Sequence, residues 1–191
     1  MSNSTQKEID CLEENRIIFV NGNFDERKAE QTITKLFQYE CQSPTKDILM
    51  IIDSYGGYVD SFVAIHDCMK LLRCDIATVC AGKAMSCGQM LLISGKKGKR
   101  FITPNSRVLI HEISAGSYGK LTDLTIDVEE TKRMQKEIFE KLLLSYTKIK
   151  SSQLKDFVGI DTYLNAKRCL ELGLVDKIIT SANSLYSEIN I

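Results

Sequence analysis

Short, continuously apolar runs alternate with segments of helical period along this chain, and the alternation limits the fold more than any other feature. The apolar runs have the length of strands and fall at 16–20, 48–52, 76–80, 101–102, 107–111 and 175–179. Helical spacing of apolar residues follows at 27–39, 59–72, from about 86, at 122–148 and at 166–172. Strands that are apolar throughout are typical of a mostly parallel sheet with both faces covered. The sequence therefore predicts a layered α/β fold.

Turn-forming residues are expected to end the first three strands. They fall at 21–23, 53–57 and 81–82, each rich in Gly, Asn, Asp or Ser. No internal repeat or low-complexity linker divides the 191 residues, which suit one domain. We predict a short N-terminal segment at 1–15, one domain at 16–180 and a C-terminal tail at 181–191.

Composition excludes several classes of protein. The 25 basic and 25 acidic residues balance, so no overall field attracts nucleic acid or anionic lipid. No apolar run of membrane-spanning length occurs, and the N-terminus does not resemble a signal peptide. The seven cysteines form no CxxC pair or Cys/His cluster, so we expect neither a disulfide framework nor a metal site. A soluble, intracellular protein without metal or organic cofactor is expected.

The chain has two histidines, so a histidine-based mechanism must use His66 or His111. His66 falls inside a predicted helix, four residues after Phe62, and is interpreted as a solvated or core-edge residue. His111 ends an apolar strand and precedes a loop with Gly116 and Gly119. Loops at strand ends are common places for reactive groups in α/β folds.

Ser86 falls between a predicted strand and a predicted helix and is flanked by small residues. It could be a nucleophile at a helix N-terminus, or it could only cap that helix. Gly56-Gly57 could be a plain turn, or the Gly57 N–H could join the Cys87 N–H in an oxyanion hole. Asp161 precedes the last helix and could orient a histidine, but other acids could do so equally well.

From residue 16 to 179 the sequence resembles the Clp protease proteolytic subunit. The closest stretches are RIIFVNG, SYGG, VCAGKAMSCGQMLL, GKKGKRFITPNSRVLIH and DTYLNAKRCLELGLVD. The resemblance implies Ser86 as nucleophile, His111 as base and Asp161 as orienting acid. It also implies oxyanion donors at the N–H groups of Gly57 and Cys87.

The resemblance further implies a fold of the ClpP/crotonase type, built from repeated β-β-α units with a protruding handle at about 117–148. Such subunits form seven-membered rings that stack as a tetradecamer and can work with a Clp-type AAA+ ATPase. The face of the handle helix between Met134 and Leu143 is expected to remain unburied without a partner subunit. Unfolded polypeptides would be the substrates, with no nucleic acid or membrane partner, in a bacterial cytoplasm, a phage-infected cell or an organelle interior.

An extended substrate is expected to pair with two backbone segments. The residues concerned are Gly56, Tyr58 and Val59 in the first segment and Ser114, Ala115 and Gly116 in the second.

Three residues depart from the family pattern. Tyr55 stands where a proline is usual in the glycine-rich loop, and Ile113 replaces a proline two residues after His111. Ile160 replaces the arginine that usually precedes the aspartate and links ring contacts to the active site.

The leading hypothesis is a serine endopeptidase. ATP would be consumed by a partner, because the chain has no GxxxxGK[ST] phosphate-binding motif. A weak or catalytically silent ring component is the alternative, motivated by Tyr55, Ile113 and Ile160. A third hypothesis is an acyl-CoA enzyme of the crotonase superfamily, which needs no serine nucleophile.

Overall fold

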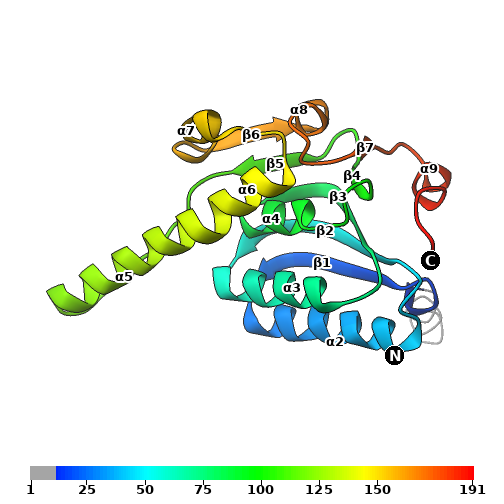
Figure 1. Cartoon of the computed structure of the whole chain (residues 1–191), viewed down its shortest axis with the longest axis horizontal. Coiled ribbons are helices and arrows are strands. Elements are labelled where there is room, and N and C mark those ends of the chain that lie inside the picture. The colour runs from blue at the N-terminus through cyan, green and yellow to red at the C-terminus, as the bar shows by residue number, and fades with distance from the viewer. Residues whose placement is uncertain (1–11) are drawn as a thin grey trace.

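A seven-stranded sheet forms the centre of the computed structural model, which describes residues 12–191 (Figure 1). The main strand order is β1-β2-β3-β4-β7, and β5 pairs with both β3 and β6. The strands are β1 (Ile17–Phe24), β2 (Ile48–Gly57), β3 (Ile76–Met85), β4 (Arg100–Ile102), β5 (Arg107–Ile110), β6 (Thr162–Asn165) and β7 (Lys177–Ile178). Every pairing is parallel except that of β5 with β6. The predicted α/β class is confirmed.

Helices connect the strands and pack mainly on one face of the sheet. The helices are α2 (Glu26–Gln42), α3 (Val59–Leu71), α4 (Cys87–Ile93), α5 (Leu121–Met134), the π-helix η1 (Gln135–Glu140), α6 (Lys141–Tyr146), the 3₁₀ turn η2 (Ser151–Gln153), α7 (Leu154–Val158), α8 (Ala166–Glu171) and α9 (Ala182–Tyr186). In the described part of the chain, no helix combines the length and apolar character needed to cross a membrane.

The core has two parts because successive strand residues point to opposite faces of the sheet. Ile18, Val20, Met50 and Ile52 belong to the larger cluster, which α2, α3 and α4 cover. The smaller cluster lies on the other face, where side chains of the C-terminal segment pack against it. Its buried members are Ile17, Leu49, Ala77, Val79, Phe101 and Ile179, with Leu185 and Ile189 beside them.

The first three strands are longer than predicted, and the expected turns at 21–23, 53–57 and 81–82 are wrong. β1 continues to Phe24, which pairs with Gly57, and its register shifts between Asn21 and Asn23. β3 continues through Gly82 to Met85. A neighbouring strand supplies backbone hydrogen-bond partners whatever the side chains are, so tertiary pairing overrides local turn preference. The added residues carry each strand to the edge of the sheet where the candidate site lies.

The long helix predicted at 122–148 is present as α5, η1 and α6, one helical rod with a π-helical turn inside it. The expectation of an unburied face between Met134 and Leu143 is wrong, because Phe139 and Leu143 are buried in the larger core cluster. The exposed part is α5, which has no buried residue and projects from the body as a handle (Figure 1). Leu121 and Ile126 on α5 are exposed by 82% and 61%.

The C-terminal end is fixed to the loop before β2. Asp47 N–H donates to the Asn190 carbonyl over 2.7 Å, and the Asn190 N–H donates to the Asp47 carboxylate over 2.9 Å. The division into 1–15, 16–180 and 181–191 stays a prediction, and residues 1–11 lie outside the described part of the chain.

Candidate functional site

Ser86 occupies a sharp turn between β3 and α4. Its backbone angles are φ = 53° and ψ = −126°, a left-handed conformation that is strained for a residue with a Cβ atom. The turn is held on both sides. Ser86 N–H donates to the Leu109 carbonyl of β5 over 3.1 Å, and the Ser86 carbonyl accepts from Gln89 and Met90 of α4.

Capping does not account for this serine, because its side chain makes no capping hydrogen bond to α4. A strained strand-to-helix turn is instead the geometry that presents the nucleophile in α/β-hydrolases.

Sheet topology brings three distant segments to one edge. β3 and β5 are parallel neighbours with Met85 paired to Leu109, so the residues that follow them, Ser86 and His111, emerge at the same edge. β6 runs antiparallel to β5, with Thr162 paired to Ile110. That register places Asp161 beside His111, although fifty positions separate them in sequence.

His111 Nδ1 lies 3.7 Å from Asp161 Oδ1. This exceeds hydrogen-bond length, and the aspartate side chain is 65% exposed. His111 Nε2 is buried and has no hydrogen-bond partner among the described residues. Both contacts of a triad would thus have to shorten during catalysis, as is common when no substrate is bound.

The glycine pair at the end of β2 packs directly against Ser86. A Cβ atom on Gly56 would lie 2.8 Å from the Ser86 Cβ and 3.0 Å from the Cys87 nitrogen, so only glycine fits there. The Cys87 thiol donates to the Gly57 carbonyl over 3.4 Å. Cys87 is the first residue of α4, and the N–H of such a residue has no acceptor within its helix. Gly57 and Cys87, the two residues predicted to supply oxyanion donors, are therefore in contact.

Cys87 itself does not compete with Ser86 as a nucleophile. It is 1% exposed, and burial raises the pKa of its thiol to about 11. The thiolate, which is the reactive form of cysteine, is therefore scarce at neutral pH. The other histidine lies elsewhere: His66 packs between the rings of Phe62 and Tyr146 at the edge of the core.

A cleft of about 610 Å³ lies over Ser86 and His111, and Asp161 and Cys87 are not among its described lining residues. Ser86 and His111 line it, together with four of the predicted substrate-contact or oxyanion residues: Gly56, Gly57, Tyr58 and Ser114. The cleft also includes Asn23, Phe24 and Asp25, which the sequence did not single out because β1 was expected to end before them. The one sequence feature that could have indicated a longer first strand is Phe24, an aromatic residue directly after the polar run at 21–23.

Three predicted substrate-contact residues lie outside the residues that line this cleft. Val59 is the first residue of α3 and packs partly against the core. Ala115 and Gly116 line a separate cavity beside α5.

The three departures from the family pattern have distinct surroundings. Tyr55 is exposed, and the Lys83 ammonium lies 4.5 Å from its ring centroid. Ile113 donates its backbone N–H to Gln135 Oε1 over 2.9 Å, a bond that proline could not make. Ile160 is 68% exposed, next to Asp161.

A serine on a strained turn, with a histidine and an aspartate on neighbouring strand ends, is the arrangement typical of a serine hydrolase. Comparison with known proteins narrows this class. The Clp protease family model matches residues 1–182. The chain is also 38% identical over 177 residues to the ATP-dependent Clp protease proteolytic subunit 1 of Bifidobacterium longum (strain NCC 2705), which covers 92% of this chain and 75% of the relative.

The chain belongs to the Clp protease family. It is accordingly a proteolytic subunit of the Clp type, a serine peptidase that hydrolyses peptide bonds.

Proposed function

We propose that Ser86 is the nucleophile of this peptidase, His111 its general base and Asp161 the acid that orients the base. The observation that carries the proposal is the strained Ser86 turn beside His111 on one cleft, with Asp161 held next to His111 by the pairing of β5 with β6. The backbone N–H groups of Gly57 and Cys87 would bind the oxyanion.

The chemistry follows from these positions. His111 takes the Ser86 hydroxyl proton while the oxygen attacks the peptide carbonyl, and the two N–H donors stabilise the negative charge that develops. The protonated histidine then gives its proton to the leaving amine, and an acyl-enzyme remains. Water activated by the same histidine releases the acyl group. Asp161 stabilises the cationic imidazole in both steps.

A fluorophosphonate probe tests the nucleophile directly, with adducts read by intact mass. We expect one adduct per wild-type chain, none on Ser86→Ala, and one on Ser114→Ala. Ser114 is the matched control because it lines the same cleft. An adduct on Ser86→Ala would show that another residue is activated. No adduct on a folded wild-type protein would favour the catalytically silent ring component.

We further propose that the subunits form seven-membered rings stacked as a tetradecamer, which encloses the cleft and receives unfolded polypeptide from a Clp-type ATPase. The exposed apolar residues of α5 support self-association, because a projecting helix with Leu121 and Ile126 in water is unfavourable without a partner. The similarity to the Bifidobacterium relative, which is an ATP-dependent Clp protease subunit, supports an ATPase partner.

Sedimentation velocity tests the assembly, since one chain has a mass of 21.6 kDa. We expect wild type to sediment as a large particle and Ile126→Asp to shift to smaller species. Leu71→Asp introduces the same charge at an exposed residue at the end of α3 and should have little effect. A monomeric wild type at micromolar concentration would contradict the proposal.

A reducing compartment suits the thiols of this chain, because the six described cysteines are all free. This supports a cytoplasmic location or an organelle interior.

A further inference from the structure

A cavity of about 380 Å³ lies on the body of the molecule, lined by residues other than those of the Ser86 cleft. It opens between the end of α3, the connection from α4 to β4, the end of α6 and the connection from α8 to β7. Its basic lining residues are Lys70, Lys96, Lys97, Arg100 and Lys148, and Asp176 is its only acidic one among the described residues. Its volume falls within the range of small-molecule sites.

Asp176 cannot offset the lysines because Arg100 already occupies its carboxylate. Its Oδ1 accepts from Arg100 Nη2 over 2.7 Å, and its Oδ2 accepts from Arg100 Nε over 2.9 Å and from the Gly98 N–H over 2.7 Å. Burial alone would raise the pKa of Asp176, but the hydrogen bonds from Arg100 outweigh it and hold the pKa below its usual range. The pair is neutral as a unit.

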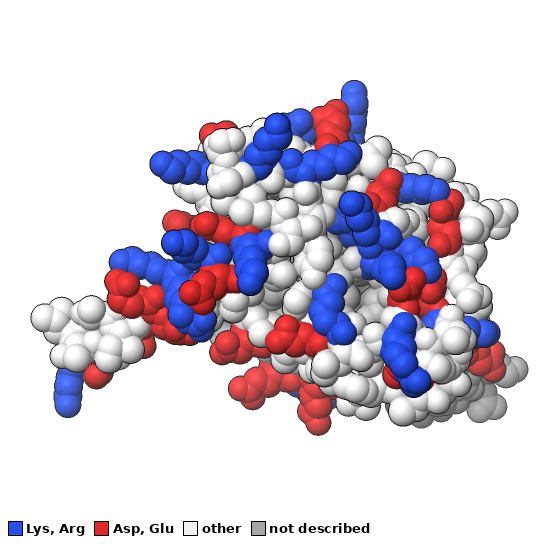
Figure 2. Space-filling model, viewed as in Figure 1, with Lys and Arg blue, Asp and Glu red and all other residues white. Residues whose placement is uncertain are grey.

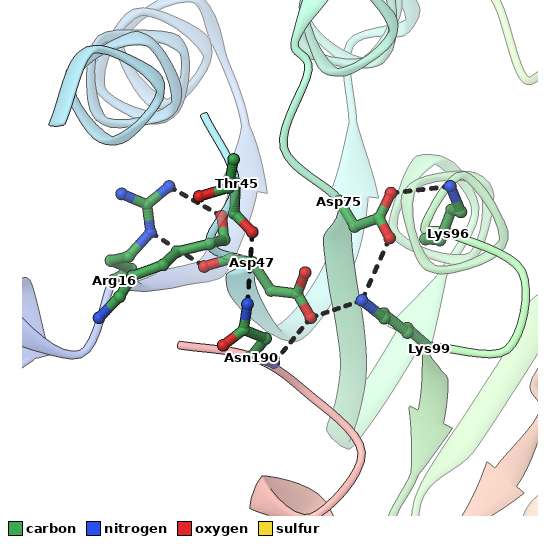
Figure 3. Close-up of polar contacts among 8 residues, drawn as sticks. Arg16, Thr45, Asp47, Asp75, Lys96, Lys99 and Asn190 are labelled. Carbon is green, nitrogen blue, oxygen red and sulfur yellow. Dashed lines mark hydrogen bonds and ion pairs between the residues drawn. The ribbon is translucent and has the colours of Figure 1, made fainter. Parts of the chain in front are cut away.

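Two neighbouring carboxylates, those of Asp75 and Asp47, are also ion-paired with lysines (Figure 3). Asp75 pairs with Lys96 over 2.8 Å and with Lys99 over 3.1 Å. Asp47 pairs with the same Lys99 over 2.7 Å and accepts the Asn190 N–H. These two carboxylates are thus paired with two lysines, one of which, Lys96, lines the cavity.

Lys70, Lys97 and Lys148 therefore keep their positive charge around the cavity without an ion pair to any described residue. Lys70 Nζ donates to the Ser94 carbonyl and lies 4.7 Å from the Tyr146 ring centroid. Figure 2 shows Lys and Arg side chains gathered over the end of α3 and β4, with a few acidic groups among them.

Arg100 adds buried N–H donors to the same wall, although Asp176 neutralises its charge. Its side chain is 4% exposed, and it donates to Asp176 and to the Tyr146 carbonyl. These contacts use Nε and one N–H on each terminal nitrogen, which is three of the five donors of a guanidinium. The remaining donors have no acceptor in the described part of the chain.

We propose that this cavity binds a small molecule that carries a phosphate group. Phosphate suits the site because it is multiply charged and accepts several hydrogen bonds at once, here from lysines as point charges and from the N–H groups of Arg100 that Asp176 and Tyr146 leave free. The concave shape favours a small ligand over an extended polyanion. Leu170 and Val175 supply apolar wall for an organic part.

Isothermal titration calorimetry with inorganic pyrophosphate at physiological salt tests the proposal on the intact assembly. We expect saturable binding of one pyrophosphate per chain. The double variant Lys97→Gln/Lys148→Gln should raise Kd about tenfold or more, since two charge-assisted contacts are lost. The control Lys120→Gln/Lys155→Gln removes the same charge from lysines that do not line the cavity and should leave Kd unchanged.

Adenosine diphosphate in place of pyrophosphate distinguishes the source of the phosphate. Tighter binding than pyrophosphate indicates an organic phosphate ester, and equal or weaker binding indicates an inorganic phosphate. Two results overturn the proposal: no saturable binding to wild type, or equal weakening by both double variants, which would mean diffuse charge attraction. The Ser86 probe experiment uses none of these residues, so either proposal can fail alone.

Discussion

The strained turn at Ser86 predicts that the proposed nucleophile lowers the stability of the fold. Its φ of 53° is rare for any residue with a Cβ atom, and such conformations cost about 1–3 kcal/mol. Ser86→Gly removes that cost, and Ser86→Ala keeps it. Against this, glycine lowers the stability of Ser86→Gly by about 0.4–1 kcal/mol, because it gives the unfolded chain more conformational freedom than alanine does. The net expectation is that Ser86→Gly is more stable than Ser86→Ala by about 1 kcal/mol.

Thermal unfolding at equal protein concentration measures this difference. In a chain of 191 residues, 1 kcal/mol corresponds to about 2–4 °C in Tm. Both variants lack the hydroxyl and should be inactive, so the difference between them reports only the effect of the Cβ atom on backbone strain and chain freedom. Equal concentrations are needed because assembly also raises Tm. A Ser86→Gly protein no more stable than Ser86→Ala would refute the argument that the turn is strained.

Two further predictions concern residues around the site and the buried ion pair. Gly56→Ala should lower the free energy of unfolding by about 3 kcal/mol or more, because its Cβ would meet the Met85 carbonyl at 2.8 Å. Gly98→Ala is the control, since Gly98 also has positive φ but lies in open space, and it should lose about 1 kcal/mol. Equal midpoints of urea unfolding for the two variants would contradict this prediction. Asp176→Asn should lose about 3 kcal/mol at pH 7 because it leaves Arg100 buried and uncompensated. Since the folded pKa of Asp176 is depressed, its contribution is present above the unfolded pKa and is lost as pH falls through the folded pKa. The difference in stability from wild type should therefore close in acid. A gap that stays constant from pH 7 to pH 3 would show that the carboxylate charge is not its source.

Local pattern alone was sufficient for the α/β class and for most helices. The segments of helical period at 27–39 and 59–72 match α2 and α3 closely, because a helix that buries one face must have apolar residues at regular helical spacing. The same pattern failed where strands continue through polar or glycine residues. There the hydrogen bonds come from a neighbouring strand, which local sequence does not specify.

The candidate site residues also divide into those that local sequence could suggest and one that it could not. A serine between a strand and a helix and a histidine after a strand were visible in the sequence, so Ser86 and His111 could be suggested from position alone. Asp161 could be chosen only through the family resemblance, because β6, the short strand beginning next to it, was not predicted.

The amino-acid sequence by itself determined the α/β class and suggested two of the three proposed triad residues, since these depend on short-range periodicity and neighbours. The tertiary structure decided which other residues lie next to them. The antiparallel register of β5 and β6 sets Asp161 beside His111, and the hydrogen bond from the Cys87 thiol to the Gly57 carbonyl joins the two residues proposed as oxyanion donors. It also left three lysines around one cavity without an ion pair to any described residue. Such contacts join segments far apart in the chain, and only the folded backbone fixes their distances.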